Sequence, residues 1–160
     1  MSTLLLPDHM PARIAAEARA AGADRVETGG FILEGERGAA SVLALTGEKG
    51  ITRRRDLFHV SGLALATLFD WAEDHELTIA AQWHTHGRRA FLSDTDLEYG
   101  FNVSGFTTTV VPYFRQASPD AKHWGWWIFD SGEWVAVPAP ESVPGSFSVI
   151  TFEEGRVDEH

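Results

Sequence analysis

The fold of this chain is restricted most by an apolar segment that leads into two histidines, His84 and His86. Residues 77–85 read LTIAAQWHT, a largely apolar run that is typical of a strand buried in a sheet. Because side chains alternate along a strand, Gln82, His84 and His86 should point to one side. We therefore expect two imidazoles to converge at the C-terminal end of this strand.

A serine and an aspartate follow the two histidines. Ser93 and Asp96 are three residues apart, so a short helix beginning there would present both side chains on its surface. Taken separately, the histidines fit a half-exposed strand, and the serine and aspartate fit a helix capping box. The combination would arise by chance in roughly one chain in 300 of this composition. We therefore interpret the four residues as one site.

Helical and strand patterns on both sides of this segment predict an α/β or α+β fold with a mixed β-sheet covered by helices. Helices are expected at about 10–21, capped by Asp8, and at 61–76, capped by Ser61 with an apolar stripe of Leu65, Leu68, Phe69 and Ala72. Strands are expected as a hairpin within 29–45 with a Gly- and charge-rich turn, a strand at 53–60, a strand at 106–114, a hairpin within 123–138 turning at 130–132, and one strand within 146–160.

Composition excludes several classes of function. With 160 residues, 44% hydrophobic and 22% charged, the chain should form one globular domain over residues 1–160. The formal charge of -10 would repel phosphate backbones, so nucleic acid is not an expected partner. No apolar run approaches the ~20 residues of a membrane span, and the first ten residues lack the pattern of a signal peptide. We expect a cytoplasmic protein that does not bind membranes.

The absence of cysteine limits the chemistry of a metal site. Thiol catalysis and cysteine-ligated metals are excluded, which leaves His, Asp and Glu as strong ligands. Two neutral imidazoles and one carboxylate form a three-ligand zinc site whose fourth position is open to water, as in catalytic zinc sites. Such a site also needs an acid/base group outside the ligand set, and a carboxylate is the usual one.

The segments ETGGFILEG, at residues 27–35, and HTHGRRAFLSDTD, at residues 84–96, together resemble the signature of the JAMM/MPN+ (JAB domain) zinc metalloproteases. The resemblance covers residues from about 10 to 130 and implies a bacterial-type, stand-alone MPN domain that binds one zinc ion. It implies His84, His86 and Asp96 as zinc ligands, Glu27 as the general acid/base, and Ser93 as the group that stabilises the tetrahedral intermediate. It also implies a substrate, a ubiquitin-like protein or its conjugates, cleaved at an isopeptide or peptide bond.

The sequence departs from the family pattern in one loop. Many deubiquitinating members have proline after the second histidine and seven residues before the serine, whereas this chain has Gly87 and six residues. This leaves the ligands in place but affects the border of the substrate cleft. The excess of arginine over lysine suggests a bacterial source. The resemblance then implies a protein that accompanies ubiquitin-like conjugation enzymes, as bacterial JAMM proteins can, some of them in antiviral defence.

Three other functions compete with that of a zinc isopeptidase. A non-catalytic MPN scaffold has no need for both ligands and a base, and a zinc nucleobase deaminase would need a His-x-Glu motif and a cysteine pair. A JAMM peptidase of phage tail assembly or of sulfur-carrier processing remains an alternative.

The roles of two arginine groups and a tryptophan group stay open at this point. Arg53–Arg55 fit either a charged edge strand or a dock for an acidic partner. Arg88 and Arg89 fit either solvated side chains or contacts to a substrate carboxylate. Trp124, Trp126, Trp127 and Trp134 fit either a packed hairpin or an interface.

Overall fold

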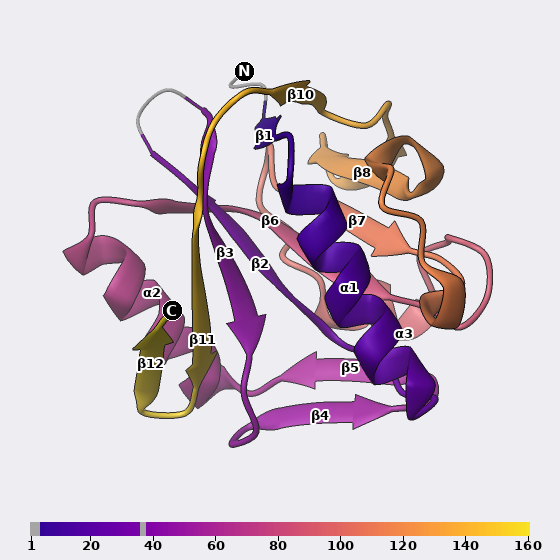
Figure 1. Cartoon of the computed structure of the whole chain (residues 1–160), viewed down its shortest axis with the longest axis horizontal. Helices are drawn as coiled ribbons and strands as arrows, with labels where there is room; N and C mark the ends of the chain where they lie inside the picture. The colour runs from indigo at the N-terminus through magenta and orange to yellow at the C-terminus, as the bar shows by residue number, and fades with distance from the viewer. Residues whose placement is uncertain (1–3, 36–37) are drawn as a thin grey trace.

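An eight-stranded mixed sheet forms the centre of the structure (Figure 1). The computed structural model describes residues 4–35 and 38–160. Its strands are β1 (Leu5–Pro7), β2 (Gly29–Glu34), β3 (Ala40–Thr46), β4 (Ile51–Arg54), β5 (Leu57–Val60), β6 (Thr78–Thr85), β7 (Thr107–Val111), β8 (Gly125–Asp130), β9 (Glu133–Ala136), β10 (Glu141–Val143), β11 (Ser148–Glu153) and β12 (Arg156–Glu159). Its helices are α1 (Met10–Ala23), α2 (Gly62–Asp74) and α3 (Asp94–Tyr99), with 3₁₀ turns η1 (Phe114–Gln116) and η2 (Ala121–His123).

The order of strands places β6 inside the sheet. The strands run β12-β11-β3-β2-β6-β7-β8-β9, and β6 is antiparallel to β2 and parallel to β7. A strand with neighbours on both sides must be apolar on both faces where helices cover it, which explains the continuous apolar run that precedes the histidines. The prediction of a mixed sheet covered by helices is confirmed.

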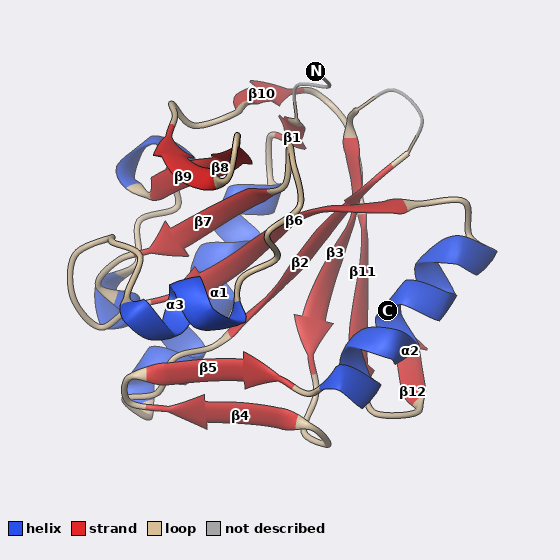
Figure 2. Ribbon diagram, turned by 180° about the vertical axis from the view of Figure 1, so that it is seen from behind, coloured by secondary structure: helices blue, strands red, loops and turns tan. Residues whose placement is uncertain are grey.

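Each face of the sheet has its own hydrophobic core. On β2, Ile32 packs in the cluster that contains Ile14 of α1, whereas Phe31 belongs to the cluster that contains Leu68 of α2. This is the alternation of side chains expected along a strand. Figure 2 shows α2 and α3 on the near face and α1 behind the sheet. Leu68 is fully buried, but Phe69 is half exposed, so the apolar stripe predicted for α2 is only partly buried.

Two short strand pairs lie at opposite ends of the large sheet (Figure 2). The antiparallel pair β4–β5 crosses one end, and the parallel pair β1–β10 lies at the other. In the part of the chain that the structure describes, no helix is both long and apolar enough to cross a membrane.

Several predicted boundaries were wrong. Helix α1 begins after His9, and Asp8 does not cap it; proline in the first turn removes an N–H that would otherwise need a cap. The single strand predicted at 53–60 belongs to the β4–β5 hairpin, which turns at Arg55 and Asp56. The single strand predicted in the tail is the hairpin β11–β12, and the β1–β10 pair was not predicted.

Other predictions were confirmed. Ser61 caps α2 by accepting a hydrogen bond from the N–H of Ala64, and the 123–138 hairpin turns at Ser131 and Gly132 between β8 and β9. The hairpin predicted within 29–45 is β2–β3, but its predicted turn includes residues 36–37, outside the described residues. Trp124 and Trp126 are buried in the core on the α1 side, which favours the packing role for these two tryptophans.

Candidate metal centre

His84, His86 and Asp96 converge on one point. Their ligand atoms all lie within 4.8 Å of one another. The Nε2 atom of His84 is 3.2 Å from Oδ1 of Asp96, and Nε2 of His86 is 3.1 Å from Oδ2 of the same carboxylate. Two ligands of one tetrahedral zinc ion stand roughly 3.3 Å apart, given zinc–ligand bonds of about 2.0–2.2 Å. The cluster therefore has the size and the donor set of a zinc site.

The capping interaction of α3 holds the Asp96 carboxylate. Ser93 Oγ accepts from the N–H of Asp96 at 3.1 Å, and Asp96 Oδ2 accepts from the N–H of Ser93 at 2.9 Å. The capping box and the ligand set, which the sequence presented as alternatives, are thus both present. The cap fixes the carboxylate in an orientation in which both of its oxygens face an imidazole.

The imidazole of His84 needs a partner that the described residues do not supply. The side chain is 4% exposed, and among residues 4–35 and 38–160 neither of its ring nitrogens has a hydrogen-bond partner. The approach of Nε2 to Asp96 is an ion-pair distance without hydrogen-bond geometry. A buried polar atom without a partner is unfavourable by about 1–3 kcal/mol. A metal ion bound through Nε2 would remove part of this penalty, which supports zinc at this position.

Backbone hydrogen bonds fix the end of β6 on both sides. His86 donates from its N–H to the carbonyl of Val111 at 2.9 Å, and its own carbonyl accepts from the N–H of Phe114 at 3.0 Å. On the other side, Thr85 donates to the carbonyl of Thr28 at 2.9 Å. The second histidine is therefore held between the end of β7 and the segment that leads into β2.

Gly87 is where this chain departs from the family pattern, and its surroundings explain the small residue. A Cβ atom at Gly87 would lie 2.9 Å from Cζ of Phe114, a buried side chain of η1. Phe91, later in the same loop, packs edge-on against His86 with ring centroids 4.8 Å apart. The short loop thus packs against the second histidine from one side, while Phe114 takes the space that a larger residue at position 87 would need.

Glu27 reaches the same site from the segment before β2. It is 6% exposed and lines the cleft that also contains His86 and Ser93. Burial, and then the carboxylates of Asp96 and Asp56, raise the pKa of Glu27 from 4.5 to about 8. A carboxyl group with a pKa near neutrality suits proton transfer in both directions.

Asp96 is shifted in the opposite direction. Burial alone would raise its pKa, but the facing imidazoles of His84 and His86 and the N–H of Ser93 outweigh burial and hold the pKa well below its usual range. Asp96 is therefore kept ionised, whereas the pKa of Glu27 lies near neutral pH. This separation is expected of a metal ligand beside an acid/base group.

The β4–β5 hairpin positions Glu27. The N–H of Glu27 donates to the carbonyl of Arg54 at 2.7 Å. Arg53 donates to Oγ1 of Thr28 at 3.0 Å and also to the carbonyl and hydroxyl oxygens of Thr46. Arg53 is thus a half-buried clamp between β3 and the segment that carries Glu27, which neither of the sequence interpretations of Arg53–Arg55 had included.

Two glycines allow the close packing around this segment. A Cβ at Gly29 would lie 2.5 Å from Cε2 of Phe58 in β5, and one at Gly30 would meet the carbonyl of Ala44 and the indole of Trp83. Gly29 is also directly opposite His84 in the β2–β6 register. The glycine pair therefore allows a close approach of side chains and backbone beside His84.

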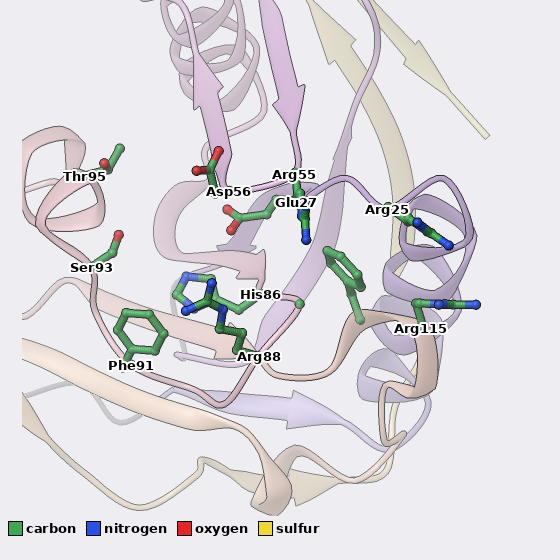
Figure 3. Close-up of a pocket in the computed structure, with 12 residues that line it drawn as sticks. Arg25, Glu27, Arg55, Asp56, His86, Arg88, Phe91, Ser93, Thr95 and Arg115 are labelled. Atoms are coloured by element: carbon green, nitrogen blue, oxygen red, sulfur yellow. The ribbon is translucent and has the colours of Figure 1, made fainter.

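The cleft has two distinct ends (Figure 3). Its volume is about 870 Å³, and Glu27 and His86 lie near its middle. Ser93 and Thr95 lie at one end, and Arg25 and Arg115 lie at the other. Arg25 lies just after the end of α1, and Arg115 lies in η1. The sequence did not indicate either residue, because no spacing pattern links them to the histidine motif.

Solved structures similar to this chain support the fold. Protein DSY2949 from Desulfitobacterium hafniense is 12% identical, with 89% of this chain and 93% of that protein covered, at a TM-score of 0.63. AF2198, a JAB1/MPN domain protein from Archaeoglobus fulgidus, is 16% identical, with 89% and 100% covered, at a TM-score of 0.51. The chain has the fold of JAB1/MPN domains.

A third structure, described as JAMM, a metalloprotease-like zinc site in the proteasome and signalosome, is 18% identical, with 88% and 98% covered, at a TM-score of 0.50. No protein-family model and no curated protein sequence matches the chain. The JAMM-like metalloprotease fold therefore rests on structural likeness, and the candidate metal site rests on the His84, His86 and Asp96 cluster itself.

Proposed function

We propose that this protein is a zinc-dependent peptidase or isopeptidase, a bacterial-type relative of the JAMM enzymes, that cleaves after the C-terminal tail of a ubiquitin-like protein. The observation that carries the proposal is the buried carboxyl of Glu27 beside the His84–His86–Asp96 cluster: Glu27 lines the same cleft as His86, and the Asp96 carboxylate raises its pKa. A scaffold that only assembles with partners has no need for this pairing.

The metal centre and Glu27 divide the chemistry between them. Bound zinc would lower the pKa of a water molecule from ~16 towards ~7. Glu27 would accept a proton from this water and later donate it to the leaving amine. Burial raises the pKa of Glu27 to about 8 without the metal, and the positive charge of a bound zinc ion would lower it again. Its burial keeps the carboxyl away from bulk water.

Ser93 would stabilise the negative charge that develops on the carbonyl oxygen of the cleaved bond. Its Oγ accepts a hydrogen bond from the N–H of Asp96, so the hydroxyl hydrogen is not used by the cap. Ser93 also lines the cleft that contains Glu27. The hydroxyl can therefore donate into the cleft while its oxygen caps α3.

Cleavage of a fusion protein tests the proposal. Ubiquitin fused to a short peptide after its C-terminal Gly-Gly is incubated with zinc-loaded protein, and mass spectrometry identifies the products. We expect a cut directly after the terminal glycine, and we expect enlargement of that glycine to leucine to block it. Cleavage elsewhere would favour a broader peptidase, and a protein that neither binds added zinc nor cleaves the fusion would favour the scaffold.

A further inference from the structure

The end of the cleft opposite Ser93 carries positive charge on a negatively charged protein. Arg25 and Arg115 lie there together, and Arg55 and Arg88 line the cleft closer to Glu27 (Figure 3). The whole chain has only 13 basic residues and a formal charge of -10. The four arginines outnumber the two acidic residues of the same lining, Glu27 and Asp56, so the cleft carries a local charge opposite in sign to that of the whole chain.

A glycine in α1 brings Arg25 and Arg115 to the same place. A Cβ atom at Gly22 would lie 2.7 Å from the backbone carbon of Phe114 and 2.9 Å from the N of Arg115. Only glycine allows the backbone of η1 to rest on the end of α1 at this distance. The contact places Arg115 beside the last turn of α1, immediately before Arg25, and so brings two cations to one end of the cleft.

The same region is tied directly to the second histidine. Phe114, the residue before Arg115, donates from its N–H to the carbonyl of His86 at 3.0 Å. The N–H of Tyr113 donates to the carbonyl of Arg88 at 3.0 Å. A chain segment bound between these arginines would therefore continue past His86 within a few residues.

Two residues in this region have left-handed backbone conformations. Arg25 has φ of 60° and Tyr113 has φ of 53°, and neither is glycine. Such conformations are unfavourable by roughly 1 kcal/mol or more each. The fold thus accepts a local cost to hold the two arginine-bearing turns at the cleft.

In the part of the chain that the structure describes, Arg25 and Arg115 have no anionic partner. Among the described residues, neither side chain makes a hydrogen bond or an ion pair, and both are exposed. Several other arginines are engaged: Arg13 pairs with Glu17, Arg156 pairs with Asp158, and the guanidinium of Arg89 stacks over Phe91. Two adjacent cations without a counter-charge are expected where an anionic ligand binds.

We propose that Arg25 and Arg115 bind the carboxylates of an acidic segment of the substrate protein, on one flank of the bond that is cleaved beside His86. The inference rests on the proposed function for the position of that bond. Guanidinium groups bind carboxylates through paired hydrogen bonds. A nucleic acid would have to lay its phosphates along an otherwise acidic surface, which favours a short acidic stretch of protein as the ligand.

Peptide binding to the zinc-loaded Glu27→Gln protein tests this without hydrolysis. Dye-labelled peptides with a central Gly-Gly carry three aspartates on the N-terminal flank or on the C-terminal flank, and matched peptides carry asparagines. Fluorescence anisotropy should show that one of the two aspartate placements binds about 10-fold more tightly than its asparagine counterpart. The other placement should show no preference.

Two pairs of substitutions, each made in the Glu27→Gln background, locate the effect. Arg25→Gln with Arg115→Gln should abolish the preference for aspartate. Arg13→Gln with Arg156→Gln makes the same change in net charge at surface ion pairs away from the cleft and should retain it. Circular dichroism and thermal unfolding check that both double variants remain folded.

The outcomes separate this inference from the proposed function. Equal binding of aspartate and asparagine peptides, equal effects of both aspartate placements, or equal losses in the two double variants would overturn the arginine site. Tighter binding of a single-stranded oligonucleotide of the same charge would assign the arginines to phosphates and overturn it as well. Failure of the active protein to cleave any fusion would count against the proposed function alone, because the binding measurement does not require cleavage.

Discussion

Glu27 lines the same cleft as the metal ligand His86, but the ligands and Glu27 are held in different ways. His84 lies in β6, His86 directly follows the end of β6, and Asp96 lies in α3. The capping box of α3 orients the Asp96 carboxylate through hydrogen bonds with Ser93, three residues earlier. Glu27 comes from a distant part of the chain, and the β4–β5 hairpin holds its segment through the carbonyl of Arg54 and the side chain of Arg53.

The two halves of the site, the ligand half (His84, His86 and Asp96) and the Glu27 half, therefore depend on different interactions. The ligand half is specified by strand alternation and a local cap, and it should respond mainly to changes of the ligands themselves. The Glu27 half is specified by packing between segments far apart in sequence. It should respond to changes in the hairpin that leave the metal untouched.

Loss of ligands should have the largest effect. His84→Ala, His86→Ala and Asp96→Ala should each lose zinc, because three protein ligands leave no redundancy. Metal analysis of the purified variants decides this, and activity should fall to background. Full zinc content in the His84→Ala/Asp96→Ala double variant would disprove the ligand assignment and remove the basis of the comparison.

Replacement of Glu27 should separate metal binding from chemistry. Glu27→Gln removes proton transfer without removing a ligand, so the variant should retain zinc and lose activity by at least ~10²-fold. Metal content and the rate of fusion cleavage are measured on the same preparation. Near wild-type turnover would show that another group is the acid/base.

Substitution of Arg53 should weaken the Glu27 half more mildly. Arg53→Lys keeps the charge but cannot reach Thr28 and Thr46 with one planar group, so Glu27 should be less well positioned. We expect kcat to fall about 10-fold with unchanged zinc content. Arg54→Lys is the matched control, because Arg54 is exposed and contributes its carbonyl alone. Equal effects of the two variants would contradict the clamp.

The smallest effect concerns the pH dependence of stability in the protein stripped of metal by a chelator. The folded-state pKa of Glu27 is raised from 4.5 to about 8, so its contribution to stability is present below pH 4.5 and is lost as pH rises towards 8. The unfolding free energy should therefore fall with pH in this window, by at most about 1.4 kcal/mol per unit from this group. Asp96, with its lowered pKa, contributes in the opposite sense, since its part is lost on acidification.

Denaturant titrations of the wild type and of Glu27→Gln between pH 5 and 8 measure this difference. The Glu27→Gln protein should lack the part of the slope that Glu27 causes. Identical slopes in the two proteins would mean that the carboxyl is ionised throughout the range, and that the packing around it does not shift its pKa.

Local patterns allowed the ligand half and the helix caps to be predicted. Alternation along residues 77–85 placed His84 and His86 together, and Ser61 was identified as a cap, because such interactions involve residues a few positions apart. Asp8 failed as a cap because proline in the first turn of α1 had already removed one of the N–H groups. The β1–β10 pair was missed because the pairing of two three-residue strands depends on contacts between the two ends of the chain.

Residue types and their spacing specify the donor atoms of the candidate metal site, their order along the chain and the lack of a thiol ligand. Packing was needed to show that Glu27 is buried with a raised pKa, that Arg53 is a clamp, and that Arg25 and Arg115 share one end of the cleft. The reason is physical: a residue type and its spacing fix which groups are available, whereas burial, neighbouring charges and contacts between distant segments fix the energy of each group, and these exist only in the packed chain.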